Sequence, residues 1–124
     1  MRDIYTAINE GDIDSVAALF DADCVRHYPR GDSPIAGDHA GRDAVIESYR
    51  YLLTHTGGNY HVEVLDLLAN DVIAASYHRA TGQRQRDGAA HDAEMIVRWR
   101  IEDGRVTEIW DYSNGIPSLN EFLR

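Results

Sequence analysis

The sequence predicts an α+β fold in which helices come first and an antiparallel sheet follows. Up to about residue 56, apolar residues mostly recur every three or four positions, as in amphipathic helices. From residue 60 they alternate with polar residues, as in half-buried strands. The turn signals Asn70-Asp71 and Asp103-Gly104 separate the alternating segments. We therefore expect a curved sheet with the helices packed on its concave face.

The composition limits the class of protein. The 124 residues suit one domain over residues 1–124. The net charge of −9 predicts no nucleic-acid partner, because such an interface needs a basic face. No apolar run approaches the roughly 20 residues that cross a bilayer, and the first residues lack the apolar core of a signal peptide. We therefore expect no membrane partner and a cytoplasmic location. The absence of lysine excludes a Schiff-base lysine and a P-loop.

Three helices are predicted in the first half of the chain. The segment MRDIYTAINEGD opens with two isoleucines four positions apart and ends at a glycine. The segment DIDSVAALF follows, with Asp12 as its N-cap. The third helix, GRDAVIESYRYLLTHTGG, ends at Gly57 and Gly58.

The remaining segments are predicted as strands and loops. A short strand, CVRHY, ends at Pro29 and leads into the loop PRGDSPIAGDHAG. Later strands are expected in YHVEVLDLLA, NDVIAASYHRATGQRQ and AEMIVRWRIEDGRVTEIWDYSN, the last of which holds two strands around a turn. The segment PSLNEFLR is expected to be a short C-terminal tail.

The final strand, RVTEIWDYSN, places a carboxylate between two aromatic residues. Alternation gives the strand two faces, one carrying Thr107, Ile109 and Asp111, the other Glu108, Trp110 and Tyr112. If Ile109 lines the interior, Asp111 does so too. Burial in an apolar pocket tends to raise a carboxyl pKa, which suits a general acid or base near neutral pH. The alternative is that Asp111 faces solvent at a frayed strand end.

The order of four segments resembles a known family over almost the whole chain. These are AINEGDIDSVAALFDADCVRHYP, SPIAGDHAGRDAVIESY, LLANDVIAASYHRATGQR and DGRVTEIWDY. They resemble the SnoaL-like branch of the nuclear transport factor 2-like superfamily. The resemblance implies a cone-shaped α+β barrel, whose strongly curved, mostly antiparallel sheet wraps the N-terminal helices and encloses a pocket. Relatives include ketosteroid isomerases, polyketide cyclases, epoxide hydrolases and dehydratases, so the fold leaves the chemistry open.

The resemblance also implies roles for particular residues. In SnoaL-like cyclases a Trp-Asp pair in the last long strand carries a pocket-facing aspartate used in acid–base chemistry, and Trp110-Asp111 matches that pair. Dimers through the outer sheet face are usual, which implies a homodimer through Glu108, Trp110 and Tyr112. A ketosteroid isomerase is disfavoured. Those enzymes have a catalytic aspartate at the place of Tyr28, and Tyr5 stands one position from their helix tyrosine. Their second oxyanion donor falls near Val97.

Tyr28 and His78 are the other candidate catalytic residues. The phenol of Tyr28 could hydrogen-bond a carbonyl or an oxyanion, and His78 lies among small residues that suit a lined cavity. Arg26 shares the face of Tyr28 and could pair with an anionic ligand or with Asp111. Strict alternation puts His27 on the opposite face, although a bulge in so short a strand would turn it inward.

Five residues are candidate ligand-binding residues: Arg26, His27, Val97, Trp99 and Ile109. Trp99 offers a flat surface to a ring-shaped ligand, with ordinary core packing as the alternative. No cofactor is expected, and no metal, since the histidines and carboxylates lack a strong ligand spacing. Cys24 is expected to be buried and structural rather than a nucleophile.

Together these patterns predict an enzyme that acts on a small, largely apolar carbonyl compound. The expected chemistry is of the isomerase, cyclase or dehydratase type, with Asp111 as the acid–base group. The alternatives are a non-catalytic module that binds a small molecule and a dimeric interaction module of the same fold.

Overall fold

The computed structural model describes residues 2–124, apart from the side chain of Arg2. Its helices are α1 (Arg2–Glu10), α2 (Ile13–Ala18), α3 (Arg42–His55) and α4 (Ile116–Leu123). Its strands are β1 (Phe20–Tyr28), β2 (Gly37–Ala40), β3 (His61–Ala69), β4 (Ile73–Gln83), β5 (Ala90–Glu102) and β6 (Arg105–Ser113). This confirms the α+β class.

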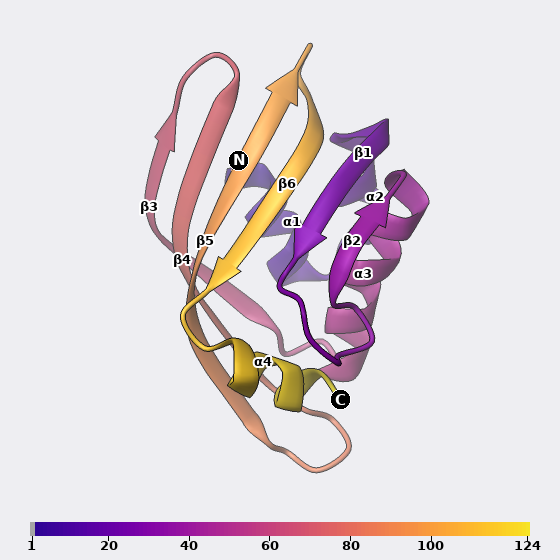
Figure 1. Ribbon diagram of the computed structural model, residues 1–124, viewed down its shortest axis with the longest axis vertical. Coiled ribbons are helices and arrows are strands. Elements are labelled where there is room, and N and C mark those ends of the chain that lie inside the picture. The colour runs from indigo at the N-terminus through magenta and orange to yellow at the C-terminus, as the bar shows by residue number, and fades with distance from the viewer. Residues whose placement is uncertain (1) are drawn as a thin grey trace.

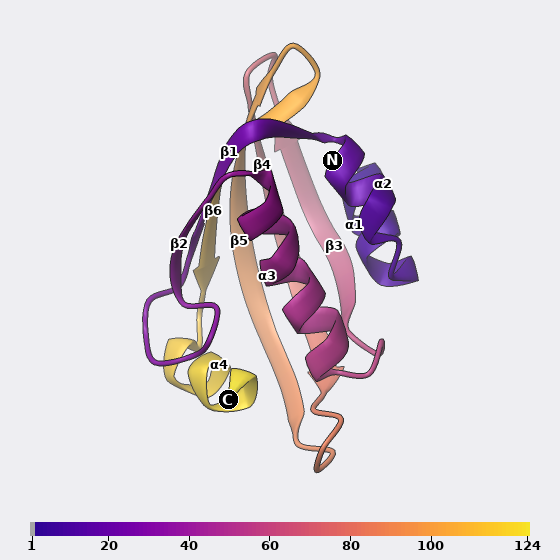
Figure 2. The same cartoon turned by 90° about the vertical axis from the view of Figure 1, so that its right-hand side faces the viewer.

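The described strands form one curved sheet in the order β2-β1-β6-β5-β4-β3 (Figure 1). Strands β1 and β6 run parallel, and all the other neighbours are antiparallel. The turn signals Asn70-Asp71 and Asp103-Gly104 join two of the antiparallel pairs, β3 with β4 and β5 with β6. Figure 2 shows α3 lying along one face of the sheet, with α1 and α2 beside it and α4 at its lower end. This face is the concave one, and the core lies between it and the helices.

Strand β1 begins at Phe20, earlier than the expected segment CVRHY, and two elements lie where none was expected. Residues 37–40 were expected within a loop, but they form β2 and pair antiparallel with the end of β1. Their sequence, GDHA, has no apolar alternation, so backbone pairing at the sheet edge makes the strand. The expected C-terminal tail is also wrong, because it forms α4. Leu119, Phe122 and Leu123 of this helix are buried, which supplies the tertiary packing that a helix of eight residues needs.

The alternation in β1 and β6 sets the position of the candidate residues. In β1, Arg26 and Tyr28 are buried on the concave side, and His27 lies on the outer face. In β6 a register shift falls opposite Arg100 and Ile101 of β5, so Val106 takes a buried place and Thr107 is half-buried. Beyond the shift, Ile109 and Asp111 point to the concave side as alternation predicted.

The core is built mainly from large apolar side chains. Trp99, Phe20 and Ile109 are almost fully buried, and each contributes on the order of 1.5–3 kcal/mol through burial. Cys24 is also buried, and desolvation followed by the nearby Asp21 raises its pKa to about 11, as suits a structural thiol. In the part of the chain that the structure describes, no helix could span a membrane.

Candidate functional site

Arg26 and Asp111 form a buried ion pair on the concave side of the sheet. The Nε of Arg26 donates to Oδ2 of Asp111 at 3.0 Å, and a terminal nitrogen donates to Oδ1 at 3.2 Å. The pair is therefore bidentate, which is the strongest arrangement for these groups. The two residues are 3% and 8% exposed. The sequence left two possible partners for Arg26, an anionic ligand and Asp111. In the structure the partner is Asp111.

The surroundings of Arg26 hold its guanidinium in place. It lies 3.9 Å from the ring centre of Tyr49 and 4.6 Å from that of Tyr28, so both rings stabilise the cation. It also donates to Ser48 Oγ at 2.9 Å. Desolvation is the largest single effect and opposes the charge, but the attraction of Asp111 and its hydrogen bonds, together with Tyr49 and Tyr28, outweigh it and raise the pKa of Arg26. The guanidinium of Arg26 is thus a fixed counter-ion for the Asp111 carboxylate.

A small cavity of about 20 Å³ lies beside this ion pair inside the fold. Its polar lining consists of Tyr5, Arg26, Tyr49, Tyr60, His78 and Asp111. A water molecule needs roughly 10–15 Å³ of such space, so the cavity is about the size of one water. The roomy enclosed pocket implied by the resemblance is largely filled here by aromatic side chains.

Five of the predicted residues line this cavity, namely Arg26, Asp111, His78, Val97 and Trp99. His78 is buried, and desolvation lowers its pKa to about 4, against a smaller opposing effect of Asp111. The indole of Trp99 meets the ring of Tyr5 edge-on, with ring centres 5.8 Å apart, and donates to Ser76 Oγ at 3.4 Å. Ile109 packs in the core and lines neither this cavity nor the cleft described below.

Tyr5 reaches the interior although its place in the helix suggested otherwise. Both Ile4 and Tyr5 are buried, because α1 packs a face wider than the 100° between successive residues. The hydroxyl of Tyr5 hydrogen-bonds Ser76, and burial raises its pKa. Tyr49 and Tyr60 were also missed as site residues. Helical periodicity placed Tyr49 on a buried face, but no sequence signal marked its hydroxyl.

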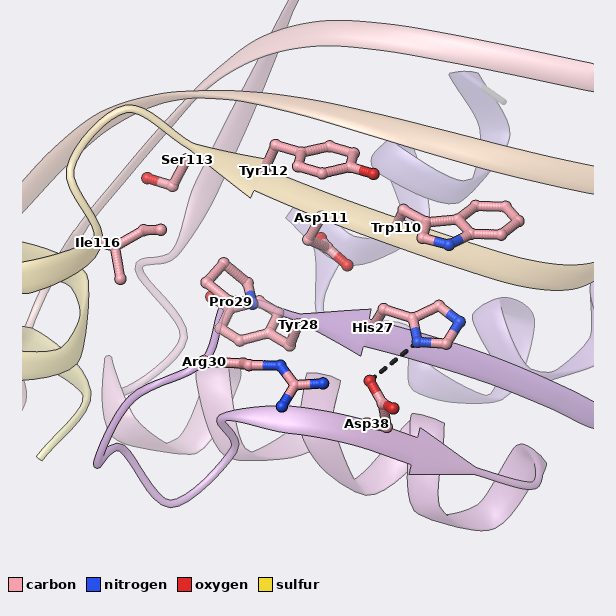
Figure 3. A pocket seen from close by; sticks show the side chains of 10 residues that line it. All are labelled: His27, Tyr28, Pro29, Arg30, Asp38, Trp110, Asp111, Tyr112, Ser113 and Ile116. Carbon is pink, nitrogen blue, oxygen red and sulfur yellow. Dashed lines mark hydrogen bonds and ion pairs between the residues drawn. The ribbon is translucent and has the colours of Figure 1, made fainter.

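A larger cleft of about 360 Å³ opens on the other side of Asp111 (Figure 3). The pairing of β1 with β6 extends only to His27 and Trp110, and the cleft begins where the two strands part. It is lined by His27, Tyr28, Pro29, Arg30, Asp38, Trp110, Asp111, Tyr112, Ser113 and Ile116. Two predicted site residues, His27 and Tyr28, thus lie here rather than at the cavity. Asp111 borders both spaces.

His27 is held between two carboxylates on the outer face. Its Nδ1 lies 2.9 Å from Oδ1 of Asp38, and its Nε2 lies 2.6 Å from Oε2 of Glu108. Its ring stacks on Trp110 with the ring centres 5.5 Å apart. Desolvation opposes protonation, but the hydrogen bonds to Glu108 and Asp38 outweigh it and raise the pKa of His27.

We expect His27 to stabilise the folded protein more in mild acid than in alkali. Its folded-state pKa lies above the ordinary value of 6.5, so the folded chain holds the proton more tightly than the unfolded one. The contribution is complete below pH 6.5 and is lost as the pH rises through the folded-state pKa. Since the ring is partly exposed, the effect should stay under about 1 kcal/mol.

Urea unfolding of the wild type and of His27→Gln, at about pH 5.5 and about pH 9, measures this contribution. The difference in unfolding free energy between the two proteins should shrink at the higher pH. A difference that grows with pH would show that the two carboxylates do not hold the imidazolium.

The outer sheet face carries the predicted dimer residues. Glu108 is engaged by His27, and Trp110 is half-buried under Arg98, whose guanidinium lies 4.4 Å from the ring centre. Tyr112 is 55% exposed, and Ile96, its neighbour across β5 and β6, is 49% exposed. The free apolar surface is therefore centred on Tyr112 rather than on Trp110.

No group of three or more potential metal ligands occurs among residues 2–124. The buried centre consists instead of an ion pair, tyrosines and a neutral imidazole. In this group of residues, Asp111 can accept a proton and the tyrosine hydroxyls can donate hydrogen bonds. Both abilities are needed for acid–base chemistry.

The comparison with sequence families decides the family. The profile described as SnoaL-like domain matches residues 1–109. The chain belongs to the SnoaL-like family. The search of curated proteins found no match.

Solved structures place this SnoaL-like protein among NTF2-like and cystatin-like folds. Bal32a, from a soil-derived mobile gene cassette, is 31% identical with a TM-score of 0.91, over 99% of this chain and 92% of that one. A protein of unknown function with a cystatin-like fold from Xanthomonas campestris is 22% identical, with a TM-score of 0.87 over 98% and 93%.

IdmH from Streptomyces antibioticus, a proposed polyketide cyclase, is 22% identical to this SnoaL-like chain. The TM-score is 0.79, over 95% of this chain and 91% of IdmH. At this identity the likeness shows the fold alone. Together with the family match, these neighbours confirm the cone-shaped α+β architecture that the sequence resemblance implied.

Proposed function

We propose that this SnoaL-like protein is an acid–base enzyme acting on a small, largely apolar carbonyl compound, with Asp111 as the base. One observation carries the proposal: a buried carboxylate, paired with a permanent cation, borders the largest cleft at the candidate site. The compound would bind in that cleft, against the apolar side chain of Ile116 and beside Asp111, which lines the cleft.

The proposed step is removal of a proton from the carbon next to the carbonyl. The C–H bond breaks, the proton forms an O–H bond with Asp111, and the electron pair moves onto the carbonyl oxygen. Tyr28 borders the same cleft, and its phenol can donate a hydrogen bond to the resulting enolate. Burial raises the pKa of Tyr28, so the phenol stays protonated as that role requires. Asp111 then returns the proton to the rearranged product.

The ion pair narrows the substrate class. Proton transfer to Asp111 would leave the buried guanidinium of Arg26 without its counter-ion, so the proton must come from an acidic C–H. A C–H between two carbonyl groups is of this kind. The fold shared with IdmH, a proposed polyketide cyclase, supports the same class of compound.

Proton exchange provides a test that needs no knowledge of the product. We would incubate the protein in D₂O with a panel of small β-dicarbonyl compounds and simple ketones, and follow the loss of the α-proton signal by NMR. The proposal expects at least one β-dicarbonyl compound to exchange well above the rate with buffer alone. A panel without any enzyme-dependent exchange would count against it.

A non-catalytic binding module is the second candidate, and the nearly filled interior favours it. Such a protein would hold an apolar compound in the outer cleft without chemistry. The same panel separates the two functions. Shifts in the NMR signals of Tyr112 and Ile116 without any proton exchange would indicate binding alone.

We also propose that the outer sheet face forms a homodimer centred on Tyr112. The adjacent exposed side chains of Tyr112 and Ile96 support this proposal. Light scattering at micromolar concentration should give the mass of a dimer for the wild type and of a monomer for Tyr112→Glu. If the wild type is a monomer at this concentration, the proposed homodimer is wrong.

A further inference from the structure

His78 presents a buried nitrogen that no group of residues 2–124 satisfies. The residue is 3% exposed, and its Nδ1 has no hydrogen-bond partner in the described chain. Its ring packs against Tyr5, with ring centres 5.2 Å apart. Buried polar atoms in folded proteins are almost always hydrogen-bonded, because an unpaired one costs about 1–3 kcal/mol. Ser33 Oγ, His91 Nε2 and Arg100 Nε are unpaired in the same way, but of these four residues only His78 lines the interior cavity, where a partner from outside the chain has room.

The interior cavity offers room for such a partner. His78 and Asp111 both line it, and its volume is about 20 Å³. An internal water needs roughly 10–15 Å³ and two to four polar contacts, whereas a small organic molecule needs far more space. The rest of the lining includes Tyr60, whose hydroxyl is a further polar group in the same wall. Size and chemistry thus both point to one water molecule.

The sheet geometry brings His78 and Asp111 to the same cavity. Ser76 of β4, Val97 of β5 and Asp111 of β6 lie in one row across the sheet. His78 lies two positions further along β4, on the same face. Both side chains are buried and line the same interior cavity. A single molecule between them can therefore contact both.

We propose that this cavity binds one water molecule, which hydrogen-bonds His78 Nδ1 and the Asp111 carboxylate. The neutral imidazole either accepts a hydrogen bond from this water or donates one to it, according to its tautomer. The Asp111 carboxylate accepts a hydrogen bond from the same water, on the interior side. His78 is then a positioning residue that acts on Asp111 through the water. The inference goes beyond the proposed function, and it holds whether or not the protein has a substrate.

The test combines crystallography with NMR in solution. A crystal structure at high resolution would show the water directly, and water-to-methyl cross-relaxation at Met95 and Val97, which line the cavity, would detect it in solution. Two variants address His78: His78→Leu removes the ring nitrogens, and His78→Gln keeps a polar group. His91→Leu is the matched control, because His91 is also buried but stacks on Phe122 outside the cavity.

We expect one water in the wild type, in His78→Gln and in His91→Leu, and none in His78→Leu. The cross-relaxation signal of His78→Leu should fall to background while its methyl resonances stay dispersed, which shows that the fold is kept. A wild-type cavity without water would overturn the inference. A water that survives in His78→Leu would overturn it as well, since other groups would then hold it. If His78→Leu does not fold, loss of the signal in His78→Gln would contradict the proposal, and its retention would support it.

Discussion

Replacing Arg26 with methionine is expected to lower the free energy of unfolding by about 3–5 kcal/mol. Methionine keeps much of the apolar stem but leaves Asp111 as a buried charge without its partner. The stacking on Tyr49 and the hydrogen bond to Ser48 are lost with the guanidinium. Urea unfolding at neutral pH measures the effect, provided that the slope of the transition is unchanged.

Two further variants make this result specific to the buried pair. Arg98→Met removes an exposed guanidinium that also lies over an aromatic ring, and it should cost no more than about 1 kcal/mol. The double variant Arg26→Met/Asp111→Leu removes both charges, and it should be less destabilised than the sum of the two single changes. Equal losses from Arg26→Met and Arg98→Met would contradict the structural role given to the ion pair.

The sequence predicts the class of fold because periodicity reports which residues are half-buried. The change from helical spacing to alternation marks the boundary between the helices and the sheet, and Asn70-Asp71 and Asp103-Gly104 mark two of its turns. The strand β2 leaves no such mark, because edge pairing of a polar segment makes it. The helix α4 has apolar residues at helical spacing, Ile116, Leu119 and Leu123, but so short a segment becomes a helix only through the tertiary packing that buries it.

The candidate site was predictable in part for the same physical reason. Alternation puts Arg26 on the face of Tyr28 and Asp111 on the face of Ile109, and the structure shows the two residues paired on the concave side. It says nothing about how far side chains fill the space in between. The small size of the cavity depends on Tyr5, Tyr49 and Tyr60, which come from separate elements and meet only in the folded chain. The outer cleft likewise depends on where β1 and β6 part, which is a property of their pairing.

Asp111→Asn is expected to reduce α-proton exchange by about 10²–10⁴-fold, the usual contribution of a positioned base. Asparagine keeps the shape and still accepts hydrogen bonds from Arg26, but it cannot take up the proton. The change also leaves Arg26 without a counter-ion, so the variant should be less stable than the wild type. Before the exchange rates are compared, an NMR spectrum with dispersed signals must therefore show that the variant is folded.

A control variant at a second carboxylate distinguishes loss of the base from loss of negative charge in general. Glu108→Gln removes a charge from the same strand, on the outer face; Glu108 does not line the cleft and contacts its lining only through His27. It should keep exchange within a few-fold of the wild type. If Asp111→Asn does not fold at the assay temperature, Arg26→Met/Asp111→Asn removes both charges and takes its place in the comparison.

The rate of enzyme-dependent α-proton exchange in Asp111→Asn, measured against the wild type on the best β-dicarbonyl compound of the panel, tests the central claim most directly. We expect the exchange to fall to the background rate while the compound still shifts the NMR signals of the cleft. Exchange at the wild-type rate in folded Asp111→Asn would show that Asp111 is not the base.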